Sequence, residues 1–163
     1  MSEFKLYILQ IATAFFGAMG FSLLYNTRRT KMLISALGGA LGWTVFTLVK
    51  LYAVDSELFC LFAAAMAVTV YAEIFARIKK TPTTTFLVVG IISMIPGSAL
   101  YYTMSYAVGN DLDKFLDTGV YTLKSAMALA VGIIVVSTAV RMASAVVTHF
   151  YKKKKEQKHK QCF

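Results

Sequence analysis

The residues best suited to bind a small solute lie in the stretch SMIPGSALYY, inside a long apolar run. Pro96 and Gly97 are the two residue types that most disfavour a helix interior, and backbone groups freed within a membrane need polar partners. If the helix is interrupted there, the amides that begin its second half offer a partial positive charge to a carboxylate. Ser93 and Ser98 would add hydroxyl groups, and Tyr101 follows one turn later. The alternative interpretation is a packing kink that binds no solute.

Four charged residues inside apolar runs, or at their ends, are the next candidates. Glu73 and Arg77 are spaced and ordered for an ion pair on one helix. They form either an ion pair that reaches the cytoplasmic surface or a proton or substrate gate at the cytoplasmic mouth of the transport pathway. Lys50 and Lys124 are either interfacial anchors or a basic exit vestibule for carboxylates.

Motifs for catalysis or metal binding are not found in the sequence. It contains neither an HExxH motif nor a GxxxxGK[ST] phosphate loop, and no nucleophile elbow. No Cys/His cluster has the spacing of metal ligands. We therefore expect no enzyme activity, no metal and no cofactor.

The elements that must position these residues are membrane-spanning helices. The chain has 163 residues, of which 58% are hydrophobic and 15% charged, and its mean hydropathy is +0.63. A soluble domain carries about 25% charged residues. The net charge of +9 is concentrated between apolar runs and at the C-terminus, which predicts contacts with anionic lipid and no nucleic-acid partner.

The apolar runs predict an all-α integral membrane protein with five transmembrane helices. Each run is about 20 residues or longer, enough to cross ~30 Å of hydrocarbon. The predicted helices span residues 6–25, 32–52, 58–78, 86–108 and 120–142. They form a single membrane domain over residues 1–150, followed by a lysine-rich tail at residues 151–163. The fourth predicted helix contains the Pro96–Gly97 pair.

Charges in the loops predict the orientation of the chain. Basic and acidic loops alternate between the runs, and basic residues favour the cytoplasmic side. This pattern places the N-terminus outside and the lysine-rich tail in the cytoplasm.

Two segments resemble the threonine/serine exporter family, in particular the small YjjB-like membrane half of a split ThrE-type exporter. The segments are AEIFARIKKTPTTTF and SMIPGSALYYTM, and GFSLLYNTRRTKMLISALGGALGW also fits the first loop and Gly-rich second helix of that family. The resemblance covers roughly residues 20–108. The matching positions are Arg77, Pro82, Pro96, Gly97 and Tyr101.

The resemblance implies a transport function and a partner. Split members of the family divide about ten helices between two proteins, so this chain would need a second five-helix membrane subunit. Family members export threonine and serine, or small dicarboxylates such as succinate, with energy drawn from an ion gradient. A location in the bacterial plasma membrane follows from the same resemblance.

We therefore expect a subunit of a secondary exporter whose interrupted fourth helix binds the carboxylate of a small solute. Two other functions remain open. The chain could be a membrane subunit that assembles a partner and transports nothing, or a small oligomeric channel.

Overall fold

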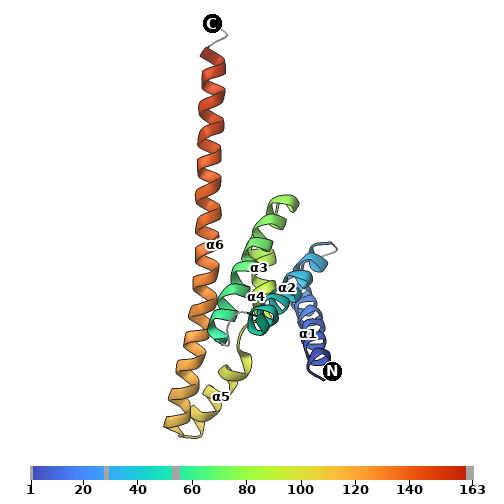
Figure 1. The fold of residues 1–163 in the computed structure, drawn as a ribbon, viewed down its shortest axis with the longest axis vertical. Helices are drawn as coiled ribbons and strands as arrows, with labels where there is room; N and C mark the ends of the chain where they lie inside the picture. The colour runs from blue at the N-terminus through green and yellow to red at the C-terminus, as the bar shows by residue number, and fades with distance from the viewer. Residues whose placement is uncertain (1, 28–29, 53–55, 161–163) are drawn as a thin grey trace.

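The computed structural model describes residues 2–27, 30–52 and 56–160, and over these residues it is helical without a strand (Figure 1). The helices are α1 (Ser2–Leu24), α2 (Thr30–Tyr52), α3 (Glu57–Lys79), α4 (Thr84–Ile92), α5 (Gly97–Val108) and α6 (Leu112–Lys160). The predicted all-α class is confirmed. The first three helices match the predicted apolar runs, with α1 beginning four residues earlier than expected.

The fourth predicted span is two helices rather than one. α4 ends at Ile92, α5 begins at Gly97, and the two helix axes are bent by 63° at the break. The predicted interruption at Pro96–Gly97 is therefore confirmed. The physical reason is local, because proline lacks the N–H that would continue the ladder and its ring collides with the preceding turn.

The last helix is much longer than the predicted run of residues 120–142. α6 contains 49 residues, which corresponds to roughly 74 Å of helix. It begins eight residues before the predicted start and continues through most of the segment assigned to the lysine-rich tail. Its upper part rises well beyond the end of α3 in Figure 1.

The core of the bundle lies where α2, α3 and α4 cross. Gly42 packs so closely that a Cβ atom built on it would lie 2.8 Å from Met94 Sδ and 2.9 Å from Val68 Cγ2. A Cβ on Gly90 would lie 2.7 Å from Val68 Cγ1. The Gly-rich face of α2 therefore closes against helices of the same chain. Small residues permit this approach because no side chain separates the two backbones.

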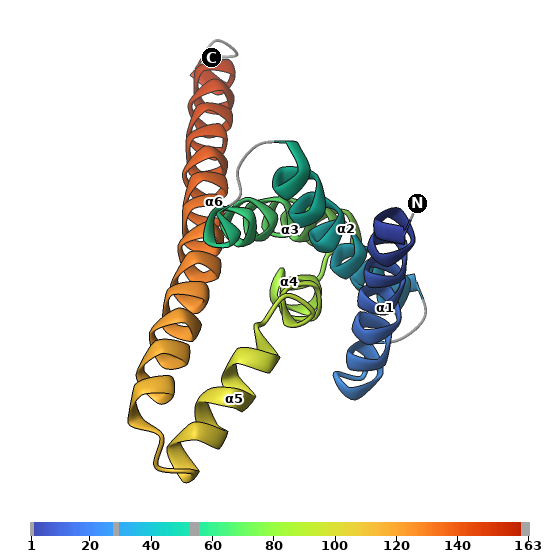
Figure 2. The ribbon, with the colours of Figure 1, turned by 60° about the horizontal axis from the view of Figure 1, so that its bottom comes forward.

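The long helices are apolar enough to cross a membrane. Within the described residues, α1 from Lys5, α2, α3 and the part of α6 up to Val146 each qualify, and the bent α4–α5 pair supplies a fifth span if it is counted as one. The protein is thus a multi-pass membrane protein. Figure 2 shows that α5 leaves the bundle and lies alongside the lower part of α6.

Candidate functional site at the broken span

A cavity of about 350 Å³ opens at the break between α4 and α5. Pro96, Gly97 and Ser98, three of the residues singled out in the sequence, line it. The other lining residues come from four helices and from the segment between α4 and α5. They are Trp43 and Phe46 of α2, Glu57 and Leu61 of α3, Met94 and Ile95 of the connecting segment, Ala99 of α5 and Tyr121 of α6. We call this space the break cavity. Its walls are mostly apolar with a few polar groups, the usual composition of a small-molecule site.

Trp43 holds the end of α4 in place. Its indole Nε1 donates a hydrogen bond of 3.0 Å to the carbonyl of Ser93, 50 residues later in the chain. The last carbonyls of a helix have no partner within the helix, so this bond satisfies one of them in a part of the protein that water does not reach freely. The Trp43 ring also packs edge-on against Phe46, with ring centroids 5.3 Å apart. The tryptophan therefore both lines the cavity and stabilises the break.

The first turn of α5 borders the break cavity with backbone donors. The N–H of Gly97 bonds the carbonyl of Ile95 at 2.7 Å, and the N–H of Leu100 bonds the carbonyl of Pro96 at 3.1 Å. Between them lie the amides of Ser98 and Ala99, first-turn donors that the helix itself cannot satisfy. The partial positive charge of a helix N-terminus therefore lies at the wall of the cavity.

Two other predicted residues lie near the break without lining the cavity. Ser93 uses its carbonyl for Trp43 and donates its hydroxyl to the carbonyl of Gly90 at 3.1 Å. Tyr101 is 69% exposed and packs edge-on against Tyr102. The hydrogen bonds of Ser93 therefore stabilise the break, whereas Tyr101 lies on the outer surface of α5.

Glu73 and Arg77 share a different cavity, of about 440 Å³, between α3 and α6. Arg77 Nη2 donates a hydrogen bond of 2.5 Å to Ser144 Oγ on α6. Within the described residues, Arg77 and Glu73 form no ion pair, and their role as a gate stays a prediction. The guanidinium reaches across to the neighbouring helix, which the spacing along α3 alone could not indicate.

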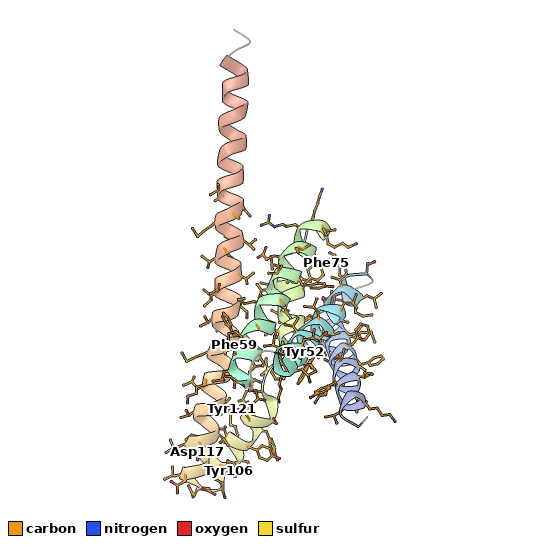
Figure 3. All side chains as sticks on the ribbon, viewed as in Figure 1. Tyr52, Phe59, Phe75, Tyr106, Asp117 and Tyr121 are labelled. Atoms are coloured by element: carbon orange, nitrogen blue, oxygen red, sulfur yellow. The ribbon has the colours of Figure 1, made fainter. Side chains whose placement is uncertain are left out.

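Lys50 and Lys124 lie in different surroundings. Lys50 is exposed, with Nζ 6.0 Å from the centroid of the Phe46 ring. Lys124 lines a cavity of about 480 Å³ together with Glu57, Asp117 and Tyr121, which we call the lower cavity. Its described lining has two carboxylates for one ammonium group, and the basic exit vestibule stays a prediction. Figure 3 shows Asp117 and Tyr121 on the lower part of α6.

Glu57 and Tyr121 are site residues that the sequence analysis missed. The Tyr121 hydroxyl donates a hydrogen bond of 2.6 Å to Glu57 Oε2. From the sequence, Glu57 is one of two acidic residues in a loop, and Tyr121 is one of nine tyrosines. No spacing signal joins residues 64 positions apart, so only the packing of α6 against α3 reveals this pair.

The arrangement is suited to holding a small polar solute. In the part of the chain that the structure describes, no three His, Cys, Asp or Glu side chains come close enough to hold a metal ion. The break cavity brings together the first turn of α5, one carboxylate and aromatic rings.

Comparison with known proteins identifies the family. The family model for Threonine/Serine exporter, ThrE, matches residues 10–139, which include the break and every residue that lines its cavity. No curated protein and no solved structure matches the chain. The match covers most of the chain and agrees with a multi-pass helical fold containing a cavity inside a broken span. The chain belongs to the threonine/serine exporter family, a family of membrane transporters and not of enzymes.

Proposed function

We propose that this chain is one subunit of a secondary exporter of small amino acids such as threonine and serine, or of small dicarboxylates, in the bacterial plasma membrane. Its family membership supports the transport role. Transport would draw on an ion gradient, as the resemblance to the exporter family implies.

The observation that carries the proposal is the cavity at the broken span. A solute carboxylate would bind the first-turn amides of α5, where the helix dipole favours negative charge. Half-helices that meet at such a break are a recurrent way to bind solutes in secondary transporters. Because Pro96 interrupts the helix, these amides have no carbonyl of a preceding helical turn to bond. Gly97 has no side chain, so it leaves the approach to the amides open.

We propose that a second five-helix membrane subunit completes the transporter. α5 has no buried residue, and one face of α1 is open, since a Cβ on Gly17 or Gly20 would meet no atom within 4 Å. These surfaces are available to another helix. The loop charges support an orientation with the N-terminus outside, and the basic C-terminal segment would contact anionic lipid at the cytoplasmic face.

Gly97 offers a matched pair of variants to test the site. A Cβ on Gly97 meets no atom within 4 Å, so Gly97→Ala is accommodated without rearrangement. Gly97→Leu places a larger side chain at the mouth of the cavity. We expect Gly97→Leu to reduce export by roughly a hundredfold, the effect of losing the charge-assisted bonds to a carboxylate, while Gly97→Ala retains most of it.

The measurement is counterflow of labelled threonine, serine and succinate in vesicles that contain this chain with its partner subunit. Normal export by the Gly97→Leu variant at equal protein level would contradict the site. Export by the partner alone would contradict the proposed role of this chain and favour an assembly function.

A further inference from the structure

One cross-helix contact joins two residues that line both cavities beside the lower part of α6. Glu57, the first residue of α3, and Tyr121 of α6 both line the break cavity, and both also line the lower cavity. Their side chains are joined by the hydrogen bond of 2.6 Å from the Tyr121 hydroxyl to Glu57 Oε2. The two spaces are thus adjacent, and this pair lies at their boundary.

The break cavity and the lower cavity differ in the charged side chains that line them. Glu57 is the only charged side chain among the described residues that line the break cavity. The lower cavity adds Asp117 and Lys124. A dianionic solute that enters the break cavity therefore meets a like charge at this boundary, whereas a solute with an ammonium group meets a partner for it.

We propose that Glu57 is the ammonium-binding residue of the solute pathway and that its bond with Tyr121 closes the break cavity toward the lower cavity. This inference rests on the proposed function and names the group that the site would recognise. The solute carboxylate contacts the first-turn amides of α5. The ammonium group of the same solute replaces the Tyr121 hydroxyl as the hydrogen-bond donor to the Glu57 carboxylate. The exchange opens the boundary only for a solute that carries a positive charge.

The exchange is chemically reasonable because both states satisfy the carboxylate. A neutral hydroxyl donor is replaced by a charged ammonium donor, which forms the stronger hydrogen bond to a carboxylate. Tyr121 is 36% exposed as a residue and lines the lower cavity, so its hydroxyl would turn toward that cavity once released. No buried group is left without a partner when the contact opens.

The first experiment measures the opening of the break cavity without measuring transport. Ser98 lines this cavity, so a Ser98→Cys variant of the full-length chain, with both native cysteines replaced by alanine, reports access to a water-soluble maleimide. We expect Tyr121→Phe and Glu57→Gln to raise the labelling rate about tenfold, the population shift that follows loss of one hydrogen bond to a charged group. Tyr106→Phe and Asp113→Asn are the matched controls, because neither residue lines the two cavities.

An unchanged labelling rate in both Tyr121→Phe and Glu57→Gln would overturn the closing role. A second reporter, Ala99→Cys, lines the same cavity and keeps the test informative if cysteine at position 98 disturbs folding.

The second experiment tests the charge that Glu57 recognises. Threonine should slow the labelling of the cysteine at position 98 more strongly when Glu57 is present than in the Glu57→Gln variant. Succinate should protect the parent less than threonine does, because it meets the like charge of Glu57 there. Protection by succinate equal to that by threonine would overturn the ammonium-binding role. If labelling behaves as expected but the chain and its partner export nothing, the proposed function fails and the assignment of Glu57 stands.

Discussion

α4 and α5 are the two halves of one interrupted apolar run, and they have opposite environments. In α4, Phe86 and Val89 are each 1% exposed, and the helix packs against α2 and α3. In α5 no residue is buried, and the helix packs against α6. Both halves come from the same apolar run, so hydrophobicity alone does not place a segment in the core. The break lets the first half stay in the bundle while the second half diverges and opens a cavity.

The largest effect that distinguishes the two halves is expected for a pair of glycine substitutions. Gly90→Ala in α4 brings a Cβ to 2.7 Å from Val68 Cγ1, and overpacking of this kind costs about 1–3 kcal/mol. Gly97→Ala at the start of α5 meets no atom within 4 Å and should change stability by only a few tenths of a kcal/mol. Reversible unfolding of the purified chain in mixed detergent micelles measures both. Equal destabilisation by the two variants would show that the halves are packed alike.

A smaller effect is expected from loosening the junction between the halves. Trp43→Phe keeps an aromatic ring beside Phe46 but removes the donor to the Ser93 carbonyl, which should cost about 1–2 kcal/mol because that carbonyl loses its partner. Thr44→Val in the same helix is the control, since its hydroxyl bonds only a carbonyl of α2. Unfolding in detergent measures the difference, and a Trp43→Phe variant as stable as the parent would mean that the indole does not hold the break.

The smallest effect is expected beyond the far end of α5, at Asp111, the residue that immediately precedes α6. Asp111 accepts the side-chain hydrogen bond of Lys114 at 2.7 Å and its backbone N–H at 3.4 Å, which lowers the pKa of the carboxyl below its ordinary value of 3.8. The stabilisation is present above pH 3.8 and is lost as the pH falls through the lowered pKa. Asp111→Asn should remove this part of the pH dependence and leave the rest unchanged.

Thermal unfolding of the parent and of Asp111→Asn measures this difference in the pH dependence of stability. The pH is varied from about 2 to about 6, the range in which carboxylates titrate. The effect should be modest because the pair is exposed to solvent. Asp113→Asn, which removes another acidic residue of the same turn, is the control. Parallel pH profiles for the parent and Asp111→Asn would contradict the assignment.

Local features of the site could be predicted from the sequence, and distant contacts could not. The break at Pro96–Gly97 follows from the chemistry of those two residues, so it was predictable without a partner helix. The Trp43–Ser93 and Tyr121–Glu57 bonds join residues 50 and 64 positions apart. They depend on how α2, α3 and α6 cross, and helix crossing angles vary with the side chains at each contact. For the same reason the spacing along α3 could not indicate that α6 brings Ser144 within reach of Arg77.

The amino-acid sequence by itself determined the class of this protein, the number of its apolar segments and the position of the interruption. Each of these depends on the length of an apolar run or on the backbone chemistry of adjacent residues. Only the tertiary structure decided that the Gly-rich face of α2 closes within the chain, that α5 diverges toward α6, and that Glu57 lies at the boundary of two cavities. These outcomes depend on side chains far apart in the chain packing together, and that packing is a property of the whole bundle.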